Sequence, residues 1–187
     1  MKLAKFSIGM GDRFAHQGVA QLRAIVKANS FGLDISPVWN KSNREHIYVH
    51  SKPEDVRKEA DAAVAALGFK GKYFVDADHI NLTTVAPFVE TADFFTLDVA
   101  AFIGKPSAEA DVKAFVASCS KYMGDLFIPG MEKPLHVTTE LLEEIASKFL
   151  AATQQASEIY KYLVENKGVG NFITEVSMDE VETPQTP

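Results

Sequence analysis

The sequence is short of cysteine, of long apolar runs and of net positive charge, and each shortage excludes a class of protein. The only cysteine is Cys119, so no disulfide can form within the chain. No apolar run approaches the roughly 20 residues that span a bilayer, and polar residues follow the N-terminus too closely for a signal peptide. The net charge of -6 argues against a broad nucleic-acid surface. We therefore expect a soluble, cytoplasmic protein that binds neither membranes nor nucleic acids.

The composition that remains is that of an ordinary globular protein. Of the 187 residues, 47% are hydrophobic and 24% are charged, which is enough apolar material to bury a core. The length fits one domain of moderate size, which we assign to residues 1–187. Cys119 shares an apolar helical stripe with Val112, Phe115 and Val116, so we expect a buried small hydrophobic residue rather than a reactive thiol.

Apolar runs alternate with amphipathic segments along the chain, in an order that predicts the fold class. Strands are expected at residues 3–8, 35–39, 73–77, 94–99 and 171–177. Helices are expected near 19–26, from Pro53, near 84–90, from Ser107 and from Thr139, with a basic loop over 40–52 and a small β excursion over 125–137. This order predicts an α/β fold with about five parallel strands and crossover helices. It does not separate an open doubly wound sheet from a barrel.

The end of the sequence leaves two interpretations of this sheet. The strand at 171–177 is followed by acidic residues, and no helix comes after it to cover the sheet. A (β/α)8 barrel needs eight strand–helix units and typically about 250 residues. The chain is therefore either a complete small open sheet with a loose tail, or the N-terminal part of a truncated barrel of the TIM type.

Sites in parallel α/β folds gather at the carboxyl ends of the strands. The first strand is followed by Gly9 and Gly11, which allow a tight turn, and by Arg13, whose guanidinium suits a carboxylate or phosphate. The third glycine of a dinucleotide fingerprint is missing. Lys41 and Arg44 follow the second strand, in a loop whose amides and cations suit a polyhydroxylated anion. Each segment also fits a plain structural turn or a solvated loop.

The third strand ends in the densest group of polar residues. Asp76 and Asp78 point to the same side of a strand, and His79 follows them directly. Burying such groups without partners is costly, which favours a metal or a substrate as the partner, although capping of the next helix is the alternative. The last strand likewise ends in acids, beginning with Glu175. No nucleophile elbow supports serine catalysis.

Five stretches of the sequence carry a resemblance to a known family. They are IGMGDRFAHQG, NKSNREH, FVDADHINL, FFTLDVAAFIGKP and FITEVSMDEVETPQTP, and they cover essentially the whole chain in order. Together they resemble the tagaturonate epimerase family, a bacterial family of hexuronate catabolism. The resemblance implies a (β/α) barrel, a divalent metal of unknown identity, and interconversion of D-tagaturonate and D-fructuronate. Some members of the family act on fructose and tagatose instead.

The two ketouronates differ at a carbinol carbon β to the ketone, where simple enolisation does not invert the centre. A retro-aldol step followed by re-addition does, given a base for the hydroxyl and a metal for the ketone. By resemblance, Asp78 is the proton acceptor and His79 a metal ligand. The proton donor is Glu175 or one of Asp179 and Glu180, and we prefer Glu175 because it lies nearer the strand.

Residues near these acids complete the predicted site. Arg13, Lys41 and Arg44 are our candidates for contacts with the sugar acid, and Asp76 would orient the site. Family members are roughly twice as long, so we expect the remaining metal ligands, histidines, to come from later strands. We therefore expect the isolated chain to be poor in metal, prone to self-association through unpaired edge strands, and weak or inactive as an epimerase. The alternatives are a metal-dependent sugar-acid aldolase and a non-catalytic half-barrel.

Overall fold

The computed structural model describes residues 1–179 and 181, and its contacts divide the chain into two compact units. Unit 1 comprises Met1–Asp98 and Glu158–Ser177, and unit 2 comprises Val99–Ser157 and the residues from Met178 onward. The long helix α5, Thr139–Lys167, belongs in part to each unit. The single domain expected over 1–187 stays a prediction. No helix in the described residues is long and apolar enough to cross a membrane.

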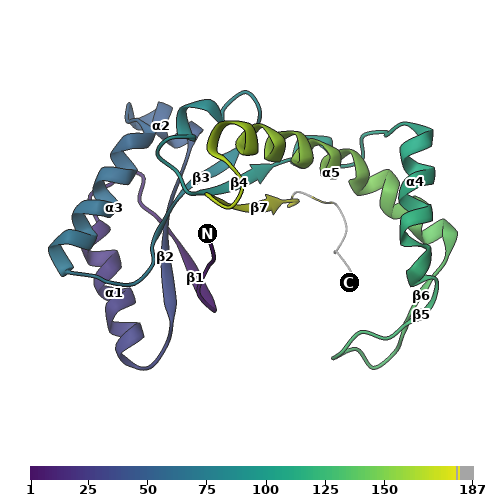
Figure 1. Ribbon diagram of the computed structural model, residues 1–187, viewed down its shortest axis with the longest axis horizontal. Helices are drawn as coiled ribbons and strands as arrows, with labels where there is room; N and C mark the ends of the chain where they lie inside the picture. Colours follow the sequence, from purple (N-terminus) through teal and green to yellow (C-terminus); the bar gives the residue numbers. More distant parts are fainter. Residues whose placement is uncertain (180, 182–187) are drawn as a thin grey trace. The chain divides into compact units, whose positions relative to one another are not determined.

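Unit 1 contains one sheet of five parallel strands (Figure 1). Its strands are β1 (Phe6–Gly11), β2 (Ile35–Ser42), β3 (Phe74–Ile80), β4 (Phe94–Asp98) and β7 (Ile173–Ser177), in the order β1-β2-β3-β4-β7. The sheet curls into a half-barrel with helices in the connections. This confirms the predicted partial TIM-type α/β fold.

The first two strands extend further than the sequence suggests. Gly9 and Gly11 were expected to end β1, but both lie inside it, where the Asn40 side chain of β2 covers them. A Cβ at Gly9 or Gly11 would lie 3.5 or 3.4 Å from the Asn40 amide atoms, which is ordinary van der Waals contact, so the space around them does not demand glycine. β2 in turn continues to Ser42, beyond the expected end.

The expected loop over 40–52 is wrong, because helix α2 (Asn43–Val49) occupies most of it. Ser42 accepts a hydrogen bond from the Glu45 N–H at 3.3 Å, and the Glu45 carboxylate accepts one from the Ser42 N–H at 3.2 Å. This capping box starts the helix directly at the end of β2. His50, with φ +54°, ends it in the left-handed conformation.

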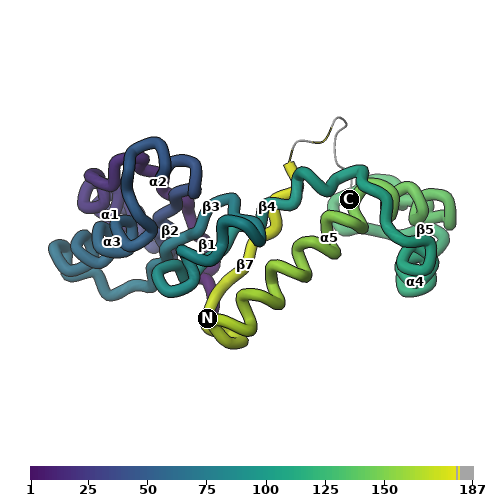
Figure 2. Tube along the Cα trace, turned by 90° about the horizontal axis from the view of Figure 1, so that it is seen from above, coloured from purple at the N-terminus to yellow at the C-terminus, as the bar shows by residue number. Residues whose placement is uncertain are grey.

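The other helices of unit 1 lie where the apolar spacing predicts them. α1 spans Gly18–Ser30, α3 spans Pro53–Leu67, and a 3-10 turn, η1, covers Ala86–Phe88. Pro53 opens α3 and Gly68 closes it at φ +59°, as their conformational preferences predict. α1 and α3 lie side by side (Figure 2) and pack on β2.

Alternation along the strands separates two faces of this sheet. The helix-covered face contributes Met10, Trp39 and Val75 to a core shared with α1 and α3. The opposite face, which we call the inner face, buries a smaller cluster of Val38, Phe74 and Phe94. Because neighbouring residues point to opposite sides, Asp76 and Asp78 share the inner face with Phe74.

The outermost strands of the sheet are β1 and β7. Each pairs with one strand in the described part of the chain. Phe6 and Ile8 on β1, and Val176 on β7, are exposed although they are apolar. Such edges are the feature on which the predicted self-association rests; the association itself stays a prediction.

Unit 2 is built from helices and a small hairpin. It holds the turns η2 (Ala100–Phe102) and η3 (Ser120–Tyr122), α4 (Glu109–Cys119), the first part of α5, and β5 (Gly124–Leu126) paired antiparallel with β6 (Leu135–Val137). The hairpin confirms the predicted β excursion. Ser107 does not cap α4, since its hydroxyl donates to Gln154 at 3.1 Å. Cys119 is partly exposed rather than buried, because α4 buries none of its residues.

Candidate active site

A pair of buried polar residues joins β3 to β4 on the inner face. The Thr96 N–H donates to one carboxylate oxygen of Asp76 at 3.1 Å, and the Thr96 hydroxyl donates to the other at 3.0 Å. Asp76 is 5% exposed and Thr96 is 4% exposed. The carboxyl group is thereby fixed in orientation within an otherwise apolar part of the sheet.

The charge around Asp76 comes from two further carboxylates. Burial, above all, raises the pKa of Asp76 to about 7, against the lowering effect of the Thr96 hydrogen bonds. The negative charges of Asp78 and Glu175 raise the pKa further. Asp78 on β3 and Glu175 on β7 therefore both act on the buried Asp76, and neighbouring like charges are one means by which proteins raise the pKa of a carboxyl group.

Asp78 and His79 lie on an irregularity in β3. The register between β3 and β4 shifts between Ala77 and Ile80, and His79 takes a left-handed conformation with φ +52°. The His79 Nδ1–H donates to Asp78 at 2.8 Å. Strain of this kind in a non-glycine residue collects at functional sites. The sequence places β3's end near Ala77 and so misses this bulge.

The candidate proton donors lie at the end of β7. Glu175 is exposed and sits in register with Thr96 of the neighbouring strand. Asp179 follows the strand, and Glu180 lies outside the described residues. The predicted acceptor Asp78 and the preferred donor Glu175 therefore both act on Asp76, from the two sides of β4.

The described residues do not form a complete metal site. No group of three or more His, Cys, Asp and Glu side chains among residues 1–179 and 181 could hold a metal ion. The Asp78–His79 pair has the arrangement in which a carboxylate orients a ligating imidazole. A catalytic metal usually takes about three protein ligands, so this pair alone falls short.

The structure separates Lys41 from Arg13 and Arg44, the other two basic residues predicted to contact the substrate. Arg13 lies in the loop after β1 and its Nε donates to Glu45 of α2 at 3.3 Å, next to the exposed Arg44. Lys41 is 1% exposed and lies on the helix-covered face, where its Nζ is 2.8 Å from Ser51 Oγ. Lys41 is in register with Ala77, so it points away from the side of β3 that carries Asp76.

Sequence reasoning missed two residues of the inner face. Thr96 interrupts the apolar strand FFTLD, and that single polar residue was the available signal. Asn40 was read only as part of a loop. Its Oδ1 is buried and has no hydrogen-bond partner in the described part of the chain. Only the pairing of β1 with β2 brings Asn40 over Gly9 and Gly11.

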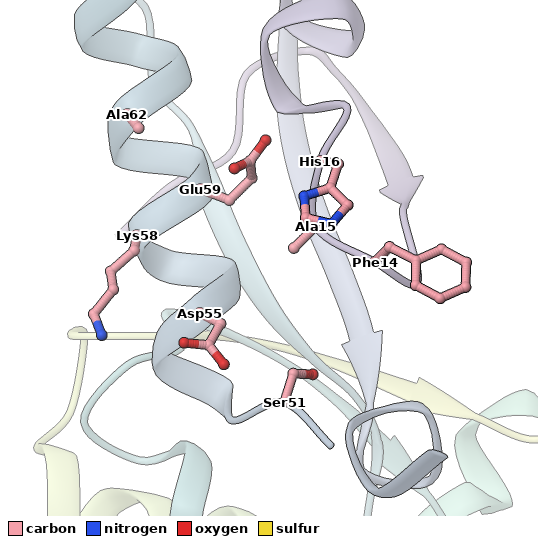
Figure 3. Close-up of a pocket in the computed structure, with 8 residues that line it drawn as sticks. All are labelled: Phe14, Ala15, His16, Ser51, Asp55, Lys58, Glu59 and Ala62. Carbon is pink, nitrogen blue, oxygen red and sulfur yellow. The ribbon is translucent and has the colours of Figure 1, made fainter. Parts of the chain in front are cut away.

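A separate pocket lies on the other side of β2. Figure 3 shows its lining from three segments, namely the loop after β1, the link between α2 and α3, and one face of α3. The lining residues are Phe14, Ala15, His16, Ser51, Asp55, Lys58, Glu59 and Ala62.

Comparisons with known proteins agree with the fold. The family model of UxaE, tagaturonate epimerase, matches residues 1–187. No match is found among the curated proteins. Crystal structures of fructuronate-tagaturonate epimerase UxaE from Cohnella laeviribosi are similar to this chain. The one-glycerol complex has 22% sequence identity and a TM-score of 0.75 over 98% of this chain. The native crystal has 21% identity and a TM-score of 0.69 over 98% of this chain.

The two-glycerol complex has 22% identity and a TM-score of 0.66 over 96% of this chain. At these identities the likeness to the solved structures shows the fold alone. The chain spans 39% of the length of the first two and 38% of the third.

Proposed function

The chain belongs to the tagaturonate epimerase family, and from that premise we propose that it forms part of an enzyme that interconverts D-tagaturonate and D-fructuronate. The observation that carries this proposal is a group of three carboxylates on the inner face of a half-barrel, in which Asp78 and Glu175 both act on the buried Asp76. Acids at the carboxyl ends of barrel strands are where this architecture performs chemistry. Fructose and tagatose are the neutral sugars whose turnover should be compared with that of the two uronates.

The proposed reaction needs one proton acceptor and one donor. Asp78 removes the proton from the hydroxyl at the carbinol carbon, and the bond from that carbon to its neighbour nearer the ketone breaks, which leaves an aldehyde and the enolate of the ketone fragment. The aldehyde fragment rotates, the same carbon–carbon bond re-forms on its opposite face, and Glu175 protonates the new alkoxide. We assign Asp76 as a positioning residue, because Thr96 binds both of its carboxylate oxygens.

The orientation of Asp78 supports its role as the acceptor. Its hydrogen bond to His79 uses one carboxylate oxygen and fixes the plane of the group. The partial exposure of its side chain, 22%, leaves the carboxylate accessible to a ligand on the inner face. Asp76, buried and bound to Thr96 through both oxygens, is less suited to meet the substrate itself.

We propose Arg13 and Arg44 as contacts of the substrate carboxylate. Both lie beyond the carboxyl ends of β1 and β2, and Glu45 ties Arg13 to α2. The inner-face acids on β3 and β7 repel an anion, so the sugar's carboxylate would lie toward the two arginines. Arg13→Gln would then raise the KM for a uronate more than the KM for a neutral ketohexose.

A divalent metal remains part of the proposal through His79 as one ligand. The other ligands would come from the length of the solved relatives that this chain does not span. Metal binding would accordingly be weak in the chain alone and stronger when that remaining length is supplied as a second polypeptide.

The proposal is tested by assaying tagaturonate–fructuronate interconversion, with added divalent cations. The purified chain is measured alone and mixed with a polypeptide that corresponds to the rest of the solved relatives. We expect little or no turnover alone and epimerisation in the mixture. Two three-carbon products instead of one inverted sugar would indicate an aldolase. Absence of both activities in a mixture that has assembled would overturn the substrate assignment.

A further inference from the structure

The helix-covered face of β2 holds a buried cation that the proposed epimerase chemistry does not use. Lys41 is 1% exposed and has one hydrogen-bond partner among the described residues, the hydroxyl of Ser51 at 2.8 Å. No carboxylate of the described chain forms an ion pair with it within 4 Å. Fully buried lysines are almost always paired, so the placement of Lys41 calls for a reason.

A second buried group meets the same hydroxyl. The Nδ1 atom of His46 lies 2.9 Å from Ser51 Oγ, and His46 is 4% exposed. Its ring packs against Phe88, with 5.6 Å between the ring centres. A lysine amine and an imidazole therefore converge on one serine oxygen, and both are held in place by the protein around them.

Ser51 also opens on solvent, through the pocket of Figure 3. The pocket has a volume of about 470 Å³, which admits a small organic molecule. One wall is the loop after β1, whose N–H groups at Phe14, His16 and Gln17 donate to the Asp12 carboxylate at 3.1, 2.7 and 2.6 Å. That wall is therefore built before any ligand arrives.

The opposite wall is one face of α3, and it limits the charge of a ligand. Asp55 and Glu59 lie on it one turn apart, and Figure 3 shows both carboxylates at the pocket. Each already accepts one backbone N–H, from Lys52 at 2.8 Å and from Gly18 at 2.9 Å respectively. The two carboxylates outnumber Lys58, the one lysine of the lining, which disfavours an anion and distinguishes this pocket from a sugar-acid site.

We propose that Ser51 is a nucleophile activated by Lys41 as general base, in a second site that hydrolyses small uncharged carboxylic esters. A serine within hydrogen-bond reach of a base that a third group accompanies is the arrangement of covalent catalysis, and lysine serves as the base in some of its variants. Burial lowers the pKa of the Lys41 amine, against the charges of Glu45, Asp12 and Asp55, which raise it. This proposal does not depend on the epimerase function.

The reaction balances without a further reagent. Ser51 Oγ attacks the carbonyl carbon, its proton moves to Lys41 Nζ, and the π electron pair of the C=O bond moves onto the carbonyl oxygen. The His46 Nδ1–H donates to Ser51 Oγ and keeps it in position. The ester C–O bond breaks, and the Lys41 ammonium returns the proton to the departing alkoxide, which leaves as an alcohol. Water then cleaves the acyl–serine bond and yields a carboxylic acid and free Ser51.

The sequence offers no sign of this site, because none of its residues forms a known motif. Lys41, His46 and Ser51 come from the end of β2, from α2 and from the link to α3. The αL conformation of His50 turns the chain so that Ser51 comes back beneath α2; the Ser51 N–H donates to the His46 carbonyl at 3.0 Å.

An uncharged alkyl fluorophosphonate tests the proposal with the full chain. Its phosphorus forms a stable bond to an activated serine oxygen as fluoride leaves. Intact mass and peptide mapping should find one adduct, on Ser51, and the chain should hydrolyse p-nitrophenyl acetate. Ser51→Ala should abolish both, and Lys41→Met, which fills the buried site without a base, should slow both about a hundredfold.

Lys70→Met is the control, since it removes an exposed lysine of the same unit that does not line the pocket. This variant should form the fluorophosphonate adduct and hydrolyse p-nitrophenyl acetate as the unmodified chain does. Thermal melting establishes that each variant is folded, and Ser51→Ala decides the matter if Lys41→Met does not fold. No adduct on Ser51 in the folded chain, or ester hydrolysis unchanged by Ser51→Ala, would overturn the proposal.

Discussion

Two Asp–His pairs in this protein have the same hydrogen-bond length and different surroundings. Asp78 and His79 lie on the bulge of β3 in unit 1, and Asp125 and His136 face each other across the β5–β6 hairpin of unit 2. In both pairs Nδ1 is 2.8 Å from the carboxylate. The side chains are 22% and 45% exposed in the first pair, and 58% and 71% in the second.

The comparison teaches that the pair itself does not define a site. Asp125 and His136 are solvated, and exposed ion pairs contribute only about 0–1 kcal/mol to stability. Asp78 stands beside the buried Asp76, on a strand whose backbone is irregular at His79. The buried acid beside it and the irregular backbone at His79, more than the hydrogen bond, distinguish the first pair as a candidate site.

The largest effect is expected from replacing the two aspartates in turn. Asp78→Asn removes the proposed proton acceptor and should lower epimerase turnover by about a hundredfold or more, because general-base catalysis contributes about that much. Asp125→Asn makes the same change in the equivalent pair of unit 2 and should leave turnover unchanged. The measurement is the interconversion assay on the assembled mixture of polypeptides. Equal losses in both variants would remove the distinction between the pairs.

A second prediction concerns the acid behind Asp78. Burial raises the pKa of Asp76 to about 7 in the folded chain, from the 3.8 of a free aspartate. Between these values the folded state keeps a proton that the unfolded state has lost, so this group makes stability fall as the pH rises. Asp76→Asn keeps an acceptor for the Thr96 N–H and should remove that fall. Urea unfolding at pH values from 4 to 7 measures it, with Asp125→Asn as the control.

A third prediction uses a histidine that is buried, unlike His79 and His136. Burial, and then the charge of Lys41, lowers the pKa of His46 to about 4 from 6.5. Between these values the unfolded state binds a proton that the folded state does not, so this group makes stability fall as the pH drops. His46→Gln should abolish that fall in the same urea experiment. The two variants should therefore change the pH profile in opposite directions, and parallel changes would contradict the assignment.

The smallest effect is expected at the exposed pair. His136→Ala should change the free energy of unfolding by no more than about 0.5 kcal/mol, because solvent screens an ion pair as exposed as this one. A urea titration at neutral pH measures this change. A loss of several kcal/mol would mean that the hairpin pair has a structural role that its exposure conceals.

Much of the fold was predictable because apolar spacing determines it. The helices from Pro53 and Thr139 and the five parallel strands follow from the periodicity and from the capping residues. The end of β2 could not be predicted in this way, because Asn40 to Ser42 are polar. They extend the strand only because they pair with β1 and β3. Tertiary pairing overrides local preference at such positions.

The candidate site was predictable only in part. Asp76, Asp78 and Glu175 follow from their alternation at strand ends, and the structure brings them together. Lys41 illustrates the limit, because one residue of register decides which face of a strand a side chain occupies. Its neighbour Asn40 faces β1's glycines, so Lys41 faces the helices.

The central claim is that the inner face around Asp78 and His79 binds the sugar acid. The direct test is to titrate the chain with tagaturonate and to follow the ring-proton NMR signals of its five histidines. The account predicts that the His79 signal shifts with increasing ligand while the His136 signal stays in place. A His79 signal that does not move, or one that moves no more than that of His136, would contradict it.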